Sequence, residues 1–128
     1  MLACPRLLIT DDDLAFRESL GEAFARRGFE VTLAEDGERG LDVARRGKFH
    51  LALVDYQMPR LSGLQMLEQL RIECPELPFI LMSGAMDESL RAEAERMRAY
   101  RVMSKPLRLR QVDSLVREAL AEVYGWAG

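Results

Sequence analysis

The sequence predicts one α/β domain, an open doubly wound five-stranded parallel sheet with five helices. Two observations support this prediction. Short apolar segments alternate along the chain with segments of helical period, which gives five βα units. The apolar runs at 7–9, 51–54 and 79–82 also lack polar alternation, and this indicates strands covered by helices on both faces. Right-handed crossovers between such strands produce an open doubly wound sheet.

Composition agrees with a single globular domain. The chain has 128 residues, of which 48% are hydrophobic and 30% are charged, enough for one hydrophobic core. No apolar stretch approaches the roughly 20 residues that cross a bilayer, and the N-terminus lacks a signal-peptide pattern. We therefore expect a cytoplasmic protein without membrane contact. Cys4 and Cys74 are expected two strand spacings apart, roughly 9–10 Å, which is too far for a disulfide.

The first two units occupy the first part of the chain. An apolar strand at 7–10 leads into a helix that stops at Gly28. Residues 29–33 alternate as a half-buried edge strand, and a turn at 36–37 begins a short helix that ends near Gly47. The inner face of the first helix is predicted to hold Phe16, Leu20, Ala23 and Phe24.

The third and fourth units follow the same pattern. After the strand at 51–54, Ser62 and Gln65 have the spacing of a capping box at the start of a helix. The strand at 79–82 leads into a helix predicted over 87–97. The inner residues of the two helices are Leu64, Leu67 and Leu70, and Leu90, Ala94 and Met97.

A short strand at 101–104 and a long helix complete the fifth unit. Residues 124–128 are predicted as a short tail of a single domain spanning 1–128, and Gly128 is compatible with either a natural end or the edge of a longer protein. The last helix has the clearest apolar stripe: Leu109, Val112, Leu115, Val116, Ala119, Leu120 and Val123.

Chemically active side chains follow four of these strands. Asp55 ends one buried run, the acids at 11–13 follow another, and Ser83 and Lys105 follow the last two. Ligands of open α/β sheets bind outside the carboxyl ends of the strands, so we expect these groups to meet at one edge. The single histidine, His50, precedes its strand and belongs at the opposite edge, which excludes histidine-based catalysis or a zinc site there.

This set of residues resembles the receiver domain of two-component response regulators, as in the chemotaxis-type single-domain regulators. The resemblance covers essentially the whole chain and implies a flavodoxin-like (βα)5 fold with strand order 2-1-3-4-5. Each motif is weak by itself, but five in order at strand ends are specific. The residues that carry it are Asp11-Asp12, Asp55 with Met58-Pro59 and Gly63, Ser83, and Lys105-Pro106.

The resemblance implies that Asp55 is the phosphoacceptor. Its carboxylate would take a phosphoryl group from a phosphohistidine of a sensor histidine kinase or a phosphotransfer protein. The domain would be no enzyme beyond its own phosphorylation and dephosphorylation. Because clustered carboxylates repel one another, the transfer needs a hard divalent cation, Mg²⁺ or Mn²⁺. Asp12 and Asp55 would bind it directly, Asp11 through water, and Gln57 through its backbone carbonyl.

The remaining two side chains would bind the phosphoryl oxygens. Lys105 would pair with them and Ser83 would hydrogen-bond one of them, with Pro106 as a cis proline that aims the lysine inward. Simpler interpretations also exist. Acids at 11–13 could cap the next helix, as Asp13 is well placed to do. Ser83 could lie in a plain turn, and Lys105 could be a solvated loop residue.

The residues expected to report phosphorylation depart from the family pattern. Val102 stands where receivers commonly carry an aromatic residue, and Tyr100 lies two positions earlier, on the same strand face by the period-2 rule. Since Val102 is small and stiff, an aromatic rotation cannot be assumed. Output is then expected to use Ser83 and a shift of the helix at 87–97.

Positive charge is concentrated near the last strand. Residues 91–110 contain seven basic and two acidic side chains, although the chain carries a net charge of −3. This basic patch is either a solvated helix face or a docking surface for an acidic partner or a second copy. Receivers use the face formed here by 87–123 to bind a downstream protein or to form a homodimer. No direct contact with nucleic acid is expected, because no helix-turn-helix or zinc motif accompanies the arginines.

Two positions on this face differ from the usual family sequence. Arg98-Ala99 replaces an Ala-Gly pair and loses the tolerance of glycine for positive φ. Arg108 replaces an acidic N-cap before the last helix, which should cost on the order of 1 kcal/mol.

Two other functions compete with a phosphorylated switch. A degenerate receiver would be a constitutive protein-binding module, but such proteins should lack an acid or the lysine, and this chain has both. A haloacid-dehalogenase-type phosphatase would use the acids at 11–13, but it places its nucleophile after the first strand and leaves Asp55 unexplained. Turnover of a phosphate ester would favour the phosphatase, and stoichiometric labelling would favour the receiver.

Overall fold

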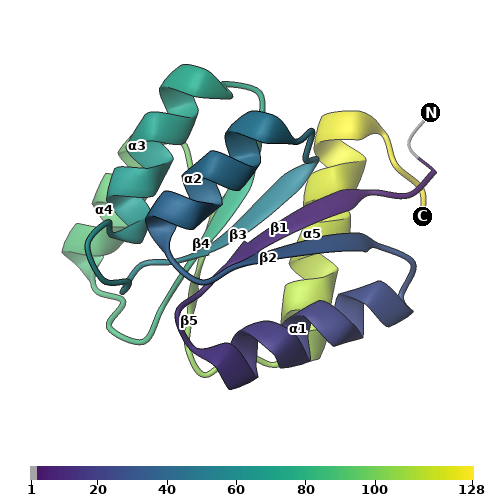
Figure 1. The fold of residues 1–128 in the computed structure, drawn as a ribbon, viewed down its shortest axis with the longest axis horizontal. Helices are drawn as coiled ribbons and strands as arrows, with labels where there is room; N and C mark the ends of the chain where they lie inside the picture. Colours follow the sequence, from purple (N-terminus) through teal and green to yellow (C-terminus); the bar gives the residue numbers. More distant parts are fainter. Residues whose placement is uncertain (1–2) are drawn as a thin grey trace.

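The computed structural model describes residues 3–128 and has five parallel strands in the order β2-β1-β3-β4-β5 (Figure 1). Helices and strands alternate without exception, so the predicted fold class and strand order are confirmed. The strands are β1 (Arg6–Thr10), β2 (Glu30–Ala34), β3 (Leu51–Asp55), β4 (Phe79–Ser83) and β5 (Arg101–Ser104). The helices are α1 (Leu14–Arg26), α2 (Gly37–Arg46), α3 (Gly63–Glu73), α4 (Glu88–Arg96) and α5 (Leu109–Tyr124).

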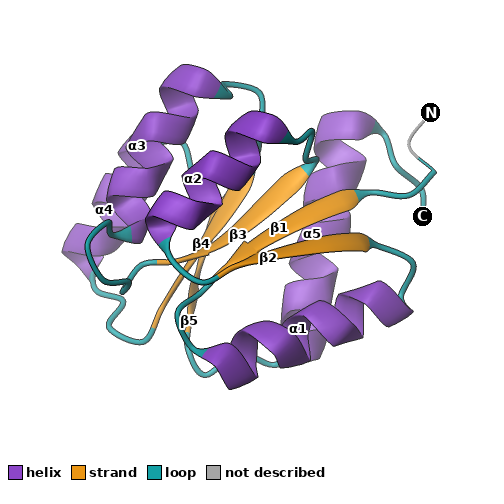
Figure 2. Cartoon of the chain, in the orientation of Figure 1, coloured by secondary structure: helices purple, strands orange, loops and turns teal. Residues whose placement is uncertain are grey.

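Helices cover both faces of the sheet, with α1 and α5 on one face and α2, α3 and α4 on the other (Figure 2). Successive strand residues point to opposite faces, so Leu7 and Ile9 pack in one hydrophobic cluster and Leu8 in the other. The strands β3 and β4 are buried along their whole length, as their uninterrupted apolar sequences predicted. The half-buried β2 lies at one edge of the sheet, also as predicted.

Most helices begin at a side chain that accepts a backbone hydrogen bond. Ser62 and Gln65 form the predicted capping box of α3, and Asp13 caps α1. The helix α5 is the exception, because its N-cap is Arg108 and no side chain accepts a bond there. The other N-caps are Asp36 and Asp87.

The structure corrects some details near the C-terminus and at element boundaries. Val123 was predicted on the inner face of the last helix but is 46% exposed. Tyr124 is the last residue of α5, so the irregular segment begins one residue later than predicted. Trp126 packs against Phe29, with ring centroids 5.4 Å apart. The second strand spans Glu30–Ala34 rather than 29–33.

Two further expectations concern cysteines and membranes. Cys4 and Cys74 are both free, as expected. Within residues 3–128, no helix combines the length and apolar character that a bilayer crossing requires.

Candidate functional site

Three carboxylates meet at the carboxyl edge of the sheet. The strands β1 and β3 are neighbours, and Thr10 pairs with Val54, so Asp11 and Asp55 follow directly at adjacent strand ends. Asp12 is the next residue along the loop. One carboxylate oxygen from each of the three acids lies within 4.8 Å of the others. The predicted convergence of these acids is therefore present in the fold.

Asp11 is fully buried, and both of its carboxylate oxygens are occupied. Oδ1 accepts a hydrogen bond from the backbone N–H of Asp13 at 2.9 Å. Oδ2 accepts one from Nζ of Lys105 at 2.9 Å. The guanidinium of Arg17 donates to the backbone carbonyl of Asp11 at 2.7 Å. These bonds compensate for burial of the carboxylate and fix the loop that leads into α1.

Lys105 reaches the acids from the end of β5. Its Nζ lies 3.2 Å from Oδ1 of Asp55, and it also lies over the ring of Phe16, 4.5 Å from the centroid. Its backbone N–H donates to the carbonyl of Ser83 at 2.8 Å, and its peptide bond to Pro106 is cis, as the resemblance implied. One ammonium group is thus shared between two carboxylates and an aromatic face.

Asp55 is a poor acid in this environment. Burial raises the pKa of its carboxyl group to about 6, with a further increase from the negative charge of Asp11, against the opposing effect of Lys105. The pKa of Lys105 is also raised. Burial alone would lower the pKa of Lys105, but the hydrogen bond that its ammonium donates to Asp11 and the charges of Asp11 and Asp55 outweigh burial. The cluster therefore carries more negative charge than one lysine neutralises.

The donor atoms of this cluster fit a hard cation. Three carboxylates offer oxygen only, the ligand type that Mg²⁺ and Mn²⁺ prefer, whereas zinc sites usually include histidine or cysteine. Among the residues that the structure describes, this is the only group of three His, Cys, Asp or Glu side chains whose donor atoms approach so closely. The excess negative charge gives a cation a clear electrostatic reason to bind.

Ser83 and Gln57 lie close to Asp55 in the topology of the sheet and in the chain, respectively. Ser83 ends β4, next to the strand that carries Asp55, and is fully buried. Its Oγ accepts a hydrogen bond from the backbone N–H of Ala85 at 3.0 Å. Gln57 lies two residues after Asp55 in the β3–α3 loop, with its side chain exposed.

Gly63 allows the loop after Asp55 to lie close against the start of α3. From the sequence, this glycine was identified only as part of a motif. A Cβ atom at this position would lie 2.5 Å from the carbonyl oxygen of Asp55 and 2.8 Å from Cα of Tyr56. The backbone N–H of Gly63 donates to the carbonyl of Tyr56 at 2.9 Å. Only glycine permits this close approach of backbone to backbone.

Tyr100 does not lie on the same face as Val102, and this expectation was wrong. Val102 packs with the cluster under α2, α3 and α4, whereas Tyr100 packs with the cluster under α1 and α5. The hydroxyl of Tyr100 donates to the carboxylate of Glu122 in α5. Tyr100 precedes the first residue of β5, so the alternation of the strand does not govern its direction.

Phe16 and Arg17 are functional candidates that the sequence did not reveal. Helical spacing assigned Phe16 to the core, and the structure confirms that it packs there while half-buried. Its contact with Lys105 joins residues from opposite ends of the chain. The sequence contains no local signal for such a contact, although α1 begins directly after the acids.

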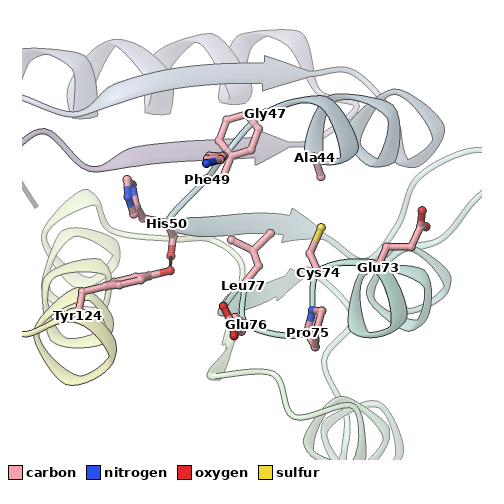
Figure 3. Close-up of a pocket in the computed structure, with 11 residues that line it drawn as sticks. Ala44, Gly47, Phe49, His50, Glu73, Cys74, Pro75, Glu76, Leu77 and Tyr124 are labelled. Carbon is pink, nitrogen blue, oxygen red and sulfur yellow. Dashed lines mark hydrogen bonds between the residues drawn. The ribbon is translucent and has the colours of Figure 1, made fainter.

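The opposite edge of the sheet contains a hollow of about 400 Å³ that includes His50 and Cys74 (Figure 3). The hydroxyl of Tyr124 donates to the backbone carbonyl of His50 at 2.9 Å. Burial and the nearby Arg6 lower the pKa of His50. This hollow lies far from the acids in the fold, as predicted for His50, and gathers no comparable group of ligating side chains among residues 3–128.

Comparison with known protein families is consistent with this geometry. Residues 7–117 match the family described as response regulator receiver domain. The transcriptional activator protein PfeR of Pseudomonas aeruginosa is 40% identical over 119 residues, which cover 93% of this chain and 39% of that protein. The chain spans half or less of the length of the curated relatives that it matches first.

Solved structures show the same fold. A CheY-like receiver domain protein from Methanospirillum hungatei superposes with a TM-score of 0.92 at 27% identity, covering 95% of this chain and 98% of that one. The response regulator TrrA from Thermotoga maritima, solved in complex with Mg²⁺-BeF, has a TM-score of 0.82 at 27% identity. That match covers 91% of this chain and 99% of TrrA.

Proposed function

Because the chain belongs to the response regulator receiver domain family, we propose that Asp55 is the residue at which this phosphorylation-dependent switch is phosphorylated. Receiver domains are signalling switches rather than classical enzymes, and they interact with histidine kinases. The observation that carries the proposal is the position of Asp55. It ends a buried strand, within 4.8 Å of two other acids and 3.2 Å from an ammonium group.

The chemistry of the proposed step follows from the nucleophile. A carboxylate oxygen of Asp55 forms a bond to phosphorus while the bond between phosphorus and the histidine nitrogen of the donor breaks. The imidazole nitrogen keeps the electron pair of that bond. Such a transfer depends mainly on positioning and charge neutralisation, and both are functions of the groups around Asp55.

The acids fit Mg²⁺ or Mn²⁺ as the cation. We propose Asp12, Asp55 and the backbone carbonyl of Gln57 as direct ligands and Asp11 as a ligand through water. Support for the indirect role of Asp11 comes from its hydrogen bonds, because both of its oxygens already accept one. When bound, the cation supplies positive charge that offsets repulsion between the acids and the phosphoryl oxygens.

Lys105 and Ser83 would contact the phosphoryl group from the other side of Asp55. The ammonium of Lys105 already lies 3.2 Å from Oδ1 of Asp55, so a small displacement would bring it to a phosphoryl oxygen. The hydroxyl of Ser83 is buried at the next strand end and would donate to another oxygen. Their charge and hydrogen bonds would stabilise the negative charge of the group being transferred.

Output is proposed to pass through the face formed by residues 87–123, to a downstream protein or to a second copy of the chain. The basic patch at 91–110 supports an acidic partner surface. The arginine side chains that belong to it are exposed, and Arg101 is paired at 3.8 Å with Glu118. We expect no direct contact with nucleic acid by this domain, and we expect the exchange with the kinase to take place in the cytoplasm.

The two alternatives have less structural support. A constitutive binding module would not need the acids, the lysine and the serine together at one edge. A haloacid-dehalogenase-type phosphatase would use Asp11 as its nucleophile, but both oxygens of Asp11 are occupied by hydrogen bonds. Asp55 offers the more available carboxylate.

Intact-mass measurement after incubation with a small phosphodonor and magnesium tests the proposal. The wild type should gain the mass of one phosphoryl group, and excess chelator should prevent the gain. Asp55→Asn should abolish labelling. The matched control is Asp42→Asn, an acid on α2 that pairs with Arg39 and Arg46, and it should label as the wild type does. Labelling that survives Asp55→Asn would remove the assignment.

A further inference from the structure

Phe16 makes a contact at this site that its place in the hydrophobic core does not require. Its ring lies 4.5 Å from Nζ of Lys105, within the range of a cation–π interaction. The side chain is half-buried, so one face contacts the core cluster under α1 and α5 while the ammonium lies over the ring. Partial burial strengthens the attraction, because less water competes for the ammonium.

The backbone of Phe16 is hydrogen-bonded to the acid loop. The backbone N–H of Phe16 donates to Oδ1 of Asp13, the N-cap of α1, at 3.2 Å. The backbone N–H of Asp13 in turn donates to Oδ1 of Asp11. The ring and the acid loop therefore belong to one short, hydrogen-bonded segment. The ammonium of Lys105 contacts both ends of this segment, Asp11 and Phe16.

The aromatic contact differs from the two carboxylate contacts in how it responds to ligands. A cation bound by the acids would compete with Lys105 for the carboxylate of Asp55, but it would not compete for the ring. The attraction of a ring extends to roughly 6 Å from its centroid, so the ammonium can move by about 1.5 Å from its present position without leaving it. A long lysine side chain would otherwise lose its order when the carboxylates are shared.

We propose that Phe16 is a positioning residue that keeps the Lys105 ammonium beside Asp55 when the acids are engaged by a cation. This inference rests on the proposed phosphorylation of Asp55. Removing the ring should leave the fold intact but slow phosphorylation, because the lysine must then be ordered during the transfer itself.

The test compares Phe16→Leu with Phe16→Tyr, which keeps the aromatic face. With a small phosphodonor and magnesium, Phe16→Leu should lower the labelling rate roughly 2- to 30-fold. Phe16→Tyr should stay within about twofold of the wild type. Phe16→Met serves as a second variant without a ring, should Phe16→Leu not fold as judged by circular dichroism.

A double-mutant cycle separates positioning from packing. In a Lys105→Ala background, Phe16→Leu should have no further effect on the rate. An equal slowing in both backgrounds, or a wild-type rate in folded Phe16→Leu, would overturn the proposal. Failure of the wild type itself to label would instead reject the phosphoacceptor assignment, so the two failures can be distinguished.

A second readout needs neither metal nor phosphodonor. The ε-methylene protons of Lys105 should resonate upfield in the NMR spectrum of the wild type, because they lie near the face of the ring. Lys105→Arg identifies the resonance by its loss. The upfield shift should persist in Phe16→Tyr and disappear in Phe16→Leu. A shift that is unchanged without the ring would show that the ammonium does not lie over Phe16 in solution.

Discussion

At the residue scale, Asp55 combines burial with an excess of neighbouring negative charge. Its carboxylate shares one ammonium group with Asp11, and its pKa is raised to about 6, chiefly by burial. An ionised Asp55 is therefore less favourable in the fold than in the unfolded chain. A divalent cation, alone or together with a phosphoryl group, can offset this excess of negative charge. The charge that suits Asp55 to its proposed function therefore also lowers the stability of the fold.

This cost predicts a pH dependence of stability in excess chelator. The folded chain holds the proton of Asp55 more tightly than the unfolded chain, in which the pKa is near 3.8. The unfolded chain therefore loses its proton first as the pH rises. The protonated carboxyl group of Asp55 therefore stabilises the folded chain. This contribution is fully present below about pH 4 and is lost as the pH rises through about 6.

Urea unfolding of the wild type and Asp55→Asn measures the effect. The variant should be the more stable protein at pH 7 in chelator, by on the order of 2 kcal/mol. The difference should shrink as the pH falls toward 4. A wild type that equals or exceeds the variant in stability at pH 7 would contradict the raised pKa.

The sequence could predict site residues whose position follows from a strand end, but not those whose contacts come from side-chain packing. Asp55, Ser83 and Lys105 could be placed at one edge because each follows an apolar strand, and parallel strands share their carboxyl edge. Phe16 could not be recognised, since its helical spacing is fully explained by packing. Tyr100 was assigned to the wrong face, because the residue before a strand need not follow its alternation.

At the element scale, the position of α3 depends on one close approach. The helix begins at Gly63, where a side chain would collide with the backbone of Asp55 and Tyr56. The capping box of Ser62 and Gln65 fixes the direction of the same turn. The end of β3 and the start of α3 therefore form one rigid unit around the proposed phosphoacceptor.

Gly63→Ala should destabilise this unit. The added methyl group meets backbone atoms that cannot move independently, so the free energy of unfolding should fall by about 1–3 kcal/mol. Gly84→Ala is a suitable control, because a Cβ there meets nothing within 4 Å, and its effect should be small. Urea denaturation of both variants gives the comparison. Equal effects in the two variants would show that the contact at Gly63 is not restrictive.

The sequence was most informative about helix starts and least informative about local strain. Asp13 before α1 and Ser62 before α3 could be recognised as caps from the sequence, whereas the structure supplies the caps Asp36 and Asp87. The sequence also indicated that Arg108 cannot cap α5, which the structure confirms. It did not show which residue after α4 would adopt a positive φ. Arg98 does so, at 61°, in the Arg98-Ala99 pair noted from the sequence.

At the scale of the whole molecule, the sheet connects the acids to the proposed output face. Lys105 follows β5, the edge strand next to β4. Val102 lies on this strand and packs on the sheet face that α2, α3 and α4 cover. Tyr100, just before the strand, contacts α5 through Glu122. We therefore expect a displacement of Lys105 toward a phosphoryl group to act on β5, the strand between α4 and α5 in the chain.

This arrangement predicts that Lys105→Ala separates phosphorylation from output. The variant should still accept a phosphoryl group at Asp55, since the acids remain, but the face at 87–123 should not respond. Hydrogen exchange before and after phosphorylation measures the response in both proteins. The wild type should change its exchange rates in β5 and α4, and the variant should not. An identical change in the variant would show that Lys105 does not transmit the signal.

The architecture as a whole could be predicted because it depends on patterns repeated along the chain. Five apolar strands alternating with five amphipathic helices leave few possible topologies. The resemblance to receivers then supplied the strand order. The side-chain contacts between distant segments depended on packing, which periodicity does not specify, and they include the cation–π contact of Phe16 and the ion pairs of Arg60 with Asp36 and Glu38.

We propose above all that Asp12 and Asp55, with Asp11 through water, bind one divalent cation beside Lys105. Adding substoichiometric Mn²⁺ to isotope-labelled, unphosphorylated protein tests this cation site directly, because the paramagnetic ion broadens the NMR signals of nearby amides. Broadening should centre on residues 11–13 and 55–57. Broadening centred on the hollow around His50 and Cys74, or spread over the exposed acids, would contradict the claim.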